Sequence, residues 1–435
     1  MFPGGSLGTS CFKLPSEPAA NKTMNEIVHT LREQFPALKR SVNGQPAVFL
    51  DGPAGTQVPQ RVIEAISEYL VNHNANHGGL FATSRESDEM LDETHRAMAD
   101  FLGADDPDCV CFGPNMTSLT FAISRALSRT WNAGDEVIVT RLDHDANVTP
   151  WVLAAQDVGA TVRHVEVRTN DCTLDLDDLR AKLSHRTRLI AVGCASNATG
   201  SINPVREICT WARAAGALTF LDAVHYAPHA LVDVSALGCD LLACSAYKFF
   251  GPHVGVLWGR RDLLEQLPAY KLRPAPNELP GKWMTGTQNH ECLAGTLAAV
   301  DYLADLGREV DAGQSSRRAA LQTAYTAIGQ YEQQLVSQLI LGLEQNDRIK
   351  IWGTTDASKL SVRLPTVSIT HANLRPAELA ERLGQRGIFV WHGNYYALQL
   401  TESLGLEPDG MVRLGLVHYN TPAEVDRLLE ELQGL

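Results

Sequence analysis

The sequence lacks the features of membrane-spanning, secreted and nucleic-acid-binding proteins. None of its apolar runs reaches the length of a membrane span. The first 22 residues have no basic start followed by an apolar stretch, so they do not form a secretory signal. Positive charge is scarce, because the net charge is −13. We therefore expect no membrane partner, no nucleic-acid partner and a cytoplasmic location.

Cysteine is missing after Cys292. The nine cysteines are scattered through the rest of the chain, and Cys111, Cys194 and Cys244 lie in apolar runs. This distribution favours buried, reduced thiols in a cytosolic protein over a disulfide framework. Cys109 and Cys111 stand one residue apart, which is not a zinc-binding spacing, so we expect no metal site.

What the chain does contain is an ordinary globular composition, with 44% hydrophobic and 20% charged residues. Expected strands at 162–167 and 189–195 alternate with expected helices at 176–183 and 204–214. Such alternation is typical of an α/β fold with a mostly parallel, doubly wound sheet.

The pattern changes at two places along the chain. Residues 1–23 are rich in Gly, Ser and Pro and are expected to form a disordered leader or an extension upstream of a second possible start at Met24. A long amphipathic helix is expected from 317 to about 343. We therefore divide the chain into that leader, an N-terminal segment at 24–44 that packs with the smaller domain, a large domain at 45–310 and a smaller α+β domain at 311–435.

The stretch around Lys248 is the first that carries chemistry. Lys248 follows an apolar strand at 241–244 and precedes a break at Gly251 and Pro252. A desolvated lysine has a lowered pKa, and its amine then acts as a nucleophile toward a carbonyl. An exposed loop lysine is the plainer alternative, and this stretch alone does not exclude it.

A second strand end lies just upstream. The apolar segment 217–221 ends in Asp222, and His225 follows three residues later. A carboxylate there can pair with the protonated ring nitrogen of pyridoxal 5′-phosphate (PLP) and keep the ring an electron sink. A lone aspartate at a strand end is often only a helix cap. The succession of Asp222-x-x-His225 and Ser245-x-x-Lys248, each after a strand, is more specific and favours PLP.

These motifs together resemble the class V aminotransferase family of PLP enzymes, in its cysteine desulfurase-like branch, from about Phe49 to the C-terminus. The resemblance implies the fold-type I architecture, in which a mostly parallel, seven-stranded-type large domain binds PLP and a smaller α+β domain follows. It also implies a homodimer that acts on a small-molecule amino acid. Thr287 matches a residue that reaches the PLP phosphate of the partner subunit.

The resemblance places the PLP phosphate at the turn 113–118, which opens a helix. Such a turn offers free backbone N–H groups and the positive end of the helix dipole. Cysteine desulfurases carry threonines where Asn115 and Met116 stand, so backbone donors must carry more of the contact, with Asn115 or Thr117 as side-chain ligands. Ser245 matches a further phosphate ligand.

The contacts to the PLP ring also follow from the resemblance. His144 stacks on the ring face and can move a proton. Asp222 pairs with the ring nitrogen, and Asn197 reaches the ring hydroxyl and the substrate carboxylate. His225 stands where cysteine desulfurases often have glutamine, and it can still hydrogen-bond the ring oxygen. Lys248, His144 and Asp222 form the expected catalytic set.

Substrate contacts are expected from three further segments. Arg413 matches the family arginine that grips the substrate α-carboxylate through two parallel hydrogen bonds. His77 lies in a polar loop that the resemblance places near the substrate, although a surface loop is an equally good interpretation. The loop 391–396 contributes Asn394 and Tyr396.

The same loop departs from the family pattern. Cysteine desulfurases need a mobile-loop thiol that takes sulfur from the substrate as a persulfide, and that position falls at Tyr396. A phenol cannot accept sulfur in this way. The sequence therefore predicts desulfurase-like β-lyase chemistry without a persulfide cysteine. An aminotransferase, an epimerase or a decarboxylative C–C bond-forming enzyme of the same family stays open, as does a scaffold without turnover.

Overall fold

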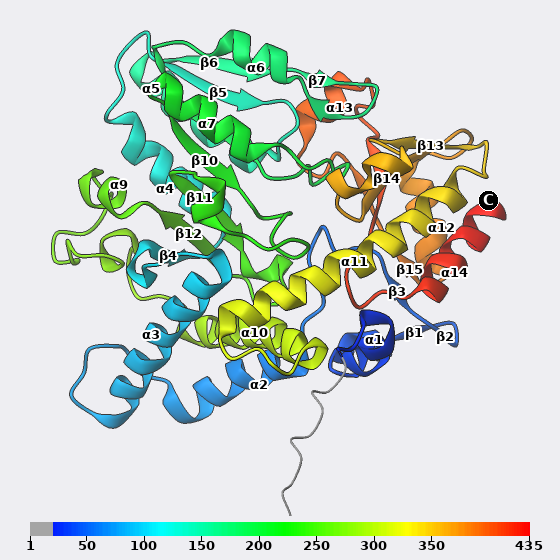
Figure 1. Ribbon diagram of the computed structural model, residues 1–435, viewed down its shortest axis with the longest axis horizontal. Helices are drawn as coiled ribbons and strands as arrows, with labels where there is room; N and C mark the ends of the chain where they lie inside the picture. Colours follow the sequence, from blue (N-terminus) through cyan, green and yellow to red (C-terminus); the bar gives the residue numbers. More distant parts are fainter. Residues whose placement is uncertain (1–20) are drawn as a thin grey trace, which may run out of the picture.

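The computed structural model describes residues 21–435, and the expected leader at 1–23 lies almost wholly outside this part of the chain. Its centre is a seven-stranded sheet (Figure 1). In spatial order the strands are β4 (Val110–Gly113), β12 (Gly255–Gly259), β11 (Leu241–Ser245), β10 (Leu218–Asp222), β9 (Thr187–Gly193), β5 (Glu136–Thr140) and β6 (Thr161–Val165). Only β12 runs antiparallel to its neighbours within this sheet. The expected mostly parallel α/β fold is confirmed.

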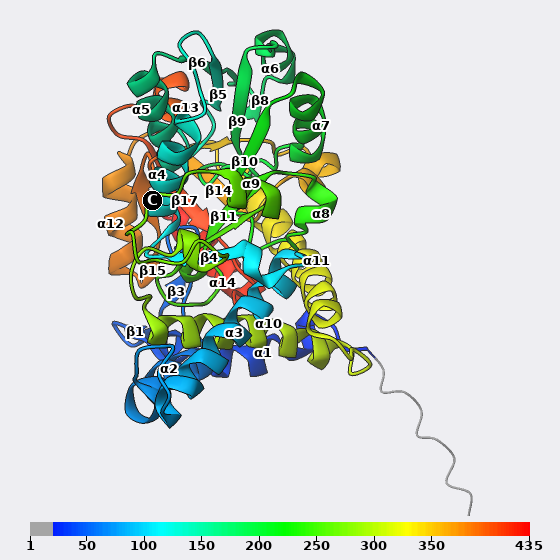
Figure 2. The same ribbon diagram turned by 90° about the vertical axis from the view of Figure 1, so that its left-hand side faces the viewer.

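Consecutive residues of the central strands face two different apolar cores. In β11, Leu241 and Ala243 belong to one buried cluster, and Leu242 and Cys244 belong to the other. Helices cover both faces, as Figure 2 shows. The helices concerned are α4 (Met116–Ser128) and α5 (Thr149–Val158) on one face, and α6 (Leu176–Lys182) and α7 (Val205–Ala215) on the other. Because both faces are buried, these strands are apolar throughout rather than alternating.

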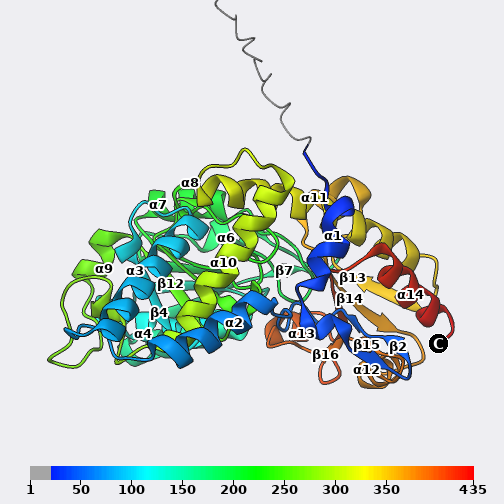
Figure 3. The same cartoon turned by 90° about the horizontal axis from the view of Figure 1, so that it is seen from below.

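A four-stranded antiparallel sheet forms the second, smaller domain (Figure 3). Its strands in spatial order are β13 (Ile349–Trp352), β14 (Thr366–His371), β17 (Met411–Gly415) and β16 (Trp391–Gly393). The helix α12 (Pro376–Gln385) packs on this sheet, and α14 (Pro422–Gln433) lies against α11 (Arg317–Leu343). The long helix α11 has the bounds that its amphipathic pattern predicts, and it connects the two domains (Figure 1).

The N-terminal part of the described chain lies against the smaller domain. The helix α1 (Met24–Glu33) contacts α11 (Figure 3). The strand β3 (Val48–Phe49) pairs in parallel with β15 (Ile388–Phe389), and Asp51 then bridges to Gly415. The turn that follows β3 therefore lies beside the junction of the two domains.

Two long helices go beyond what we expect from the sequence. They are α3 (Ala82–Leu102) and α10 (His290–Val310), and α10 packs against both α3 and α2 (Gln60–Glu68). The sequence from 59 to 71 predicts a further helix, and α2 follows this prediction only to Glu68, after which the chain continues as a π-helical turn, Tyr69–His73. The remaining short elements are β1 (Ser41–Val42), β2 (Gln45–Pro46), β7 (Val167–Arg168), β8 (Thr173–Leu174), α8 (Val234–Leu237), α9 (Arg261–Gln266) and α13 (Leu398–Ser403).

Within residues 21–435, no helix combines the length and the apolar character that crossing a membrane requires. The same residues contain no cluster of three or more His, Cys, Asp or Glu side chains arranged to hold a metal ion. The eight cysteines of this part of the chain form no disulfide, and all are buried except Cys292, which is half-buried.

Candidate active site

A cavity lies at the carboxyl ends of the central strands, where open α/β sheets bind their ligands. The cavity is lined mainly by residues at or just after the ends of β4, β5, β9, β10 and β11. The cavity brings together most of the predicted site residues, namely Asn115, Met116, Thr117, His144, Asn197, Asp222, His225, Ser245 and Lys248. Strand order in the sheet, rather than closeness in sequence, assembles this group.

Lys248 lies in the short 3₁₀ turn that follows β11. It is 9% exposed, and Nζ donates a hydrogen bond to the carbonyl oxygen of Pro53. Burial, followed by the positive charge of Arg413, lowers the pKa of Lys248 to about 7, and the carboxylate of Asp222 opposes this shift. Near neutral pH a large share of this lysine is therefore an uncharged amine, which is the form that attacks a carbonyl or accepts a proton.

Asp222 ends β10 and is buried without an ion-pair partner among residues 21–435. One of its carboxylate oxygens accepts the N–H of Val224 at 2.8 Å. Burial raises the pKa of Asp222 to about 6, and the hydrogen bond from Val224 and the charge of Lys248 oppose this shift. A carboxylate without an ion-pair partner fits a protonated ring nitrogen, which would supply that partner.

Asp143 is a second buried carboxylate in the cavity lining, and sequence reasoning missed it. It accepts the N–H of Gly193 at 2.9 Å and the side-chain amide of Asn147 at 3.0 Å. Burial raises the pKa of Asp143 to about 8, and the nearby charge of Asp222 adds to this shift. Asp143 is therefore mostly uncharged at neutral pH. Its position just after β5, a strand end like that of Asp222, is the signal that would have found it.

His144 is held as a neutral imidazole. Burial, then the charges of Lys248 and Arg413, lower its pKa to about 4. Its Nδ1 accepts the N–H of Ala146 at 3.0 Å, so the proton of the neutral ring is on Nε2. The ring of Tyr396 stacks on it, with centroids 5.3 Å apart and planes inclined by 21°.

The turn before α4 offers hydrogen-bond donors to an anion. The N–H of Ser118 is capped by the side-chain oxygen of Asn115 at 2.8 Å, and Oγ of Ser245 accepts the N–H of Met116 at 3.1 Å. Because this hydroxyl accepts, its own proton stays available to a ligand. A Cβ at Gly255 would lie 2.3 Å from the carbonyl carbon of Asn115, so β12 needs glycine here to pass the turn. The start of α4 therefore suits a phosphate.

Arg413 lies in β17, and it contacts the cavity lining through Asn197. One terminal nitrogen of the guanidinium donates to the carbonyl oxygen of Asn197 at 2.8 Å. The Nε of Arg413 and the Oδ1 of Asn197 are both buried and have no hydrogen-bond partner within the described residues. Burial lowers the pKa of Arg413 to about 10, so it is a cation at neutral pH. A buried arginine with an unused donor fits a carboxylate ligand.

The loop after β16 is fixed to the cavity residues by its backbone. The side-chain amide of Asn197 donates to the carbonyl oxygen of Tyr395 at 2.9 Å, and the N–H of Asp145 donates to that of Tyr396 at 2.7 Å. Both tyrosines have positive φ, 55° and 61°, which is unfavourable for side chains other than glycine and asparagine. The ring of Tyr395, a residue that sequence reasoning missed, lies 4.2 Å from the guanidinium of Arg413. Tyr396 itself is 71% exposed and does not line the cavity.

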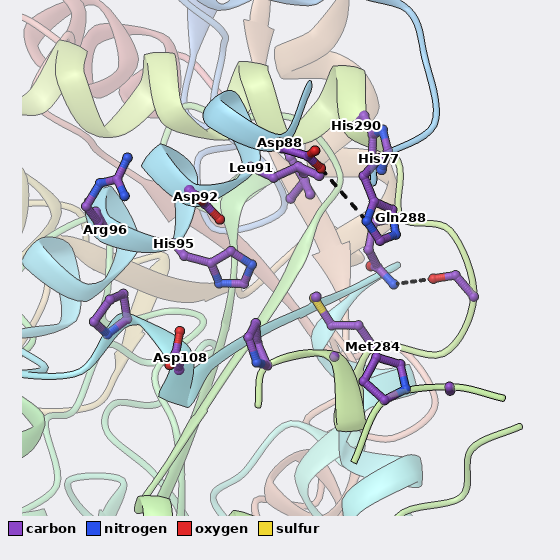
Figure 4. Close-up of a pocket in the computed structure, with 17 residues that line it drawn as sticks. His77, Asp88, Leu91, Asp92, His95, Arg96, Asp108, Met284, Gln288 and His290 are labelled. Atoms are coloured by element: carbon purple, nitrogen blue, oxygen red, sulfur yellow. Dashed lines mark hydrogen bonds and ion pairs between the residues drawn. The ribbon is translucent and has the colours of Figure 1, made fainter. Parts of the chain in front are cut away.

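Three further predicted residues do not line this cavity. His77 lines a separate pocket of about 540 Å³ together with His290 (Figure 4). Thr287 lines a third pocket. Asn394 donates to the carboxylate of Glu407 at 3.2 Å. Within a single subunit these three side chains do not join the group around the predicted lysine.

Comparison with known proteins identifies the family. Residues 48–428 match the family described as Aminotransferase class-V. The chain belongs to this family. Cysteine desulfurases from Yersinia pestis (strain Pestoides F) and Yersinia pseudotuberculosis serotype O:1b (strain IP 31758) are 31% and 32% identical over 427 residues, which cover 95% of this chain and 99% of each relative.

Comparison with solved structures supports the same family assignment. The apo cysteine desulfurase of Thermococcus onnurineus NA1 has a TM-score of 0.83, and the cysteine desulfurase CsdA of Escherichia coli has a TM-score of 0.80. Each is 25% identical and covers 94% of this chain and 98% of the other. The resemblance found in the sequence is confirmed, and the protein is a PLP-dependent enzyme of the cysteine desulfurase-like type.

The residues of the cavity fit PLP. Lys248 offers a buried amine, Asp222 a carboxylate without a cation, and Ser245 a hydroxyl proton beside a helix N-terminus. These are the partners that the aldehyde, the ring nitrogen and the phosphate of PLP require. All three lie on the lining of one cavity.

Proposed function

We propose that the protein is a β-lyase-type PLP enzyme for an L-amino acid, with cysteine desulfurase-like chemistry but without a persulfide cysteine. The observation that carries this proposal is the composition of the cavity. Its lining contains Lys248, Asp222 and His144 but no cysteine. The neighbouring loop presents Tyr396 next to His144, at the place where the family pattern leads us to expect a thiol.

The state of the cysteines supports release of the leaving group rather than its relay through the protein. Burial raises the pKa of each of the eight cysteines within residues 21–435 above its usual value, and this includes the half-buried Cys292. The thiolate, not the thiol, is the nucleophile, so these side chains are poor sulfur acceptors at neutral pH. The substituent at the β-carbon would leave as a small species. Reduced thiols also support the proposed cytoplasmic location.

PLP, when bound, supplies an electron sink for the bonds of the substrate α-carbon. Lys248 would hold it at the end of β11, and Asp222 would keep a proton on the ring nitrogen. Ser245 and the N–H groups of Asn115 and Thr117 would hold the phosphate, and His225 would meet the ring oxygen.

The substrate would bind between the two domains. Arg413, from the smaller domain at 311–435, would take the α-carboxylate through its unused Nε–H and a terminal N–H, and Asn197 would add a side-chain contact. Lys248 would accept the α-proton, since its lowered pKa leaves an uncharged amine. His144 is neutral and carries its proton on Nε2, so it would donate a hydrogen bond from this nitrogen to the β-substituent without giving up the proton.

The catalytic unit would be a homodimer. Large apolar side chains gather on and after the turn that follows α2, where Leu70, Val71, Leu80 and Phe81 are between 48% and 93% exposed. Exposed apolar groups of this size mark interaction surfaces. A second copy would cover them, and its arrival would bring Thr287 to the partner's phosphate site. Sedimentation analysis of wild type and of Leu80→Glu, Phe81→Glu tests this assembly.

The reaction is tested by product analysis. PLP-loaded protein is incubated with L-cysteine, L-cysteine sulfinate and L-aspartate, and the products are identified by mass spectrometry. From L-cysteine sulfinate we expect alanine and sulfite, because the C–S bond can break with its electrons left on the β-carbon, which then takes up a proton. From L-cysteine, the sulfur would leave as sulfide together with those electrons, and the organic products would be pyruvate and ammonia. Lys248→Ala should give none of these products. Accumulation of pyridoxamine phosphate would instead establish an aminotransferase. Alanine from aspartate alone would establish β-decarboxylation and contradict the lyase proposal.

A further inference from the structure

His225 lines the cavity, but it is held from the smaller domain. Its Nε2 lies 3.1 Å from Oγ1 of Thr366, the first residue of β14. Thr366 is fully buried and His225 is 4% exposed. The hydroxyl of Thr366 has no other hydrogen-bond partner among residues 21–435. One buried hydroxyl and one buried imidazole therefore depend on each other.

Burial, together with nearby cationic groups, keeps the ring of His225 neutral. Burial, then the nearby His229, Arg413 and Lys248, lower the pKa of His225 well below its ordinary value. His229, whose ring centroid lies 5.5 Å away, is bound through Nδ1 to the buried carboxylate of Glu332 at 2.9 Å. A neutral imidazole has one nitrogen that donates and one that accepts, so its neighbours decide which nitrogen carries the proton.

The hydroxyl of Thr366 decides this choice. If it accepted a proton from Nε2, its own buried O–H would have no acceptor, which buried polar groups rarely tolerate. If it donates to Nε2, both groups are satisfied and the ring proton is on Nδ1. Because Nε2 is occupied, Nδ1 is the only ring nitrogen of His225 left to meet a molecule in the cavity.

We propose that Thr366 is a positioning residue that fixes His225 in the Nδ1–H form, so that the smaller domain presents a hydrogen-bond donor to the ring oxygen of PLP. This inference rests on the proposed function for its ligand, but the tautomer itself is a property of the protein alone. Thr366 acts through His225 and touches neither PLP nor substrate in this role. Because Thr366 belongs to β14, a shift of this strand would also change the hydrogen bond that His225 would donate to the ring oxygen of PLP.

Two variants separate the hydroxyl from the shape of the side chain. Thr366→Val removes the hydroxyl at nearly constant volume, and Thr366→Ser keeps it as a matched control. In PLP-free protein labelled with ¹⁵N-histidine, long-range ¹H–¹⁵N spectra report which ring nitrogen is protonated, and His225→Gln assigns the signal. We expect the Nδ1–H form in wild type and Thr366→Ser, and a mixture or the Nε2–H form in Thr366→Val.

A second readout uses PLP-loaded protein. The visible absorption band of the bound cofactor is titrated with pH, and loss of an ordered donor to the ring oxygen should shift its midpoint in Thr366→Val by about 0.5 to 1 pH unit, because an ordinary hydrogen bond accounts for about one pKa unit or less. Thr366→Ser should stay at the wild-type midpoint. Unchanged ring signals in Thr366→Val, or equal shifts in both variants, would overturn the proposal. If wild type shows no visible band with PLP, the proposed function fails while the ring spectra still decide the tautomer.

Discussion

Two groups of ionisable side chains are buried in this molecule, and they differ in how their charges are met. His229 and Glu332 face each other at 2.9 Å behind the cavity, and both are at most 3% exposed. Lys248 and Asp222 are also at most 9% exposed, yet neither takes part in an ion pair with any described residue. The two groups are buried to a similar extent, but only His229 and Glu332 have each other as ion-pair partners.

This difference distinguishes ionisable residues that stabilise the fold from those that carry out the reaction. In a buried pair each group is the partner of the other, so removing one of the two leaves the other uncompensated and is expected to destabilise the fold. Buried groups without partners have pKa values moved toward neutrality, about 7 for Lys248 and about 6 for Asp222, which suits proton transfer and leaves room for a charged ligand. Four experiments, ordered from the largest expected effect to the smallest, test this contrast.

Lys248→Ala should abolish turnover, with a loss of at least ~10³-fold in kcat, because it removes both the anchor and the base. Lys282→Ala is the matched control, since Lys282 is equally exposed at 9% and also donates to backbone carbonyls, those of Leu264 and Glu265, but does not line the cavity. Steady-state kinetics of the two PLP-treated variants makes the comparison. Similar losses in both would mean that burial alone matters.

Glu332→Ala should lower the free energy of unfolding by about 3 kcal/mol or more, because it leaves His229 buried without its partner. The activity per folded molecule should change little. Urea unfolding measures the first quantity and active-site titration the second. Glu207→Ala, which removes an exposed ion pair with Arg180, should cost under about 1 kcal/mol. A Glu332→Ala protein that is stable but inactive would place the pair in the chemistry.

The rate at which PLP reacts with PLP-free protein should rise with pH and level off near pH 7. The pKa of Lys248 is lowered to about 7, so the amine is protonated below that pH and each unit of pH gained there yields about tenfold more of the reactive form. Stopped-flow absorbance from pH 5 to pH 10 follows the reaction. A rate that keeps rising toward pH 10 would show that this lysine is not perturbed.

Tyr396→Ala should raise the pKa of His144 from about 4 toward 6.5, because burial is the main cause of its lowering and Tyr396 covers one side of the ring. Stacked aromatic pairs contribute about 0.5 to 1.5 kcal/mol, so a shift of about one unit or less is expected. Histidine NMR titration of PLP-free protein measures it, with Tyr396→Phe as the variant that keeps the stack. No shift in Tyr396→Ala would show that the stack is incidental.

Much of the central sheet and of its site follows from local sequence. β10 and β11 end at Asp222 and Ser245, which the sequence places at strand ends. Lys248 follows within three residues of the second strand end. These residues are predictable because an apolar strand and the polar side chain after it are neighbours in the chain, and parallel strands place all such ends at one edge.

The rest depends on contacts between distant segments. Helix α3 escaped prediction because its buried face includes Ser84, Ser87 and Thr94, which weaken the apolar periodicity. Thr366 and Tyr395 acquire their roles only through His225 and Arg413, each far away in sequence. No spacing rule connects such pairs. The assignment of His77 and Thr287 to a site needs a second subunit and stays a prediction.

The buried thiols have a practical consequence for handling the protein. The eight cysteines of residues 21–435 are largely un-ionised at neutral pH, so alkylating reagents and mild oxidants should react with them slowly. Cys11 lies outside the described residues and can be replaced by serine. In the resulting folded protein, the remaining cysteines should react too slowly to compete with a single introduced cysteine for a fluorescent label. A cysteine placed at the exposed position 396 would then report by its emission when the loop leaves His144.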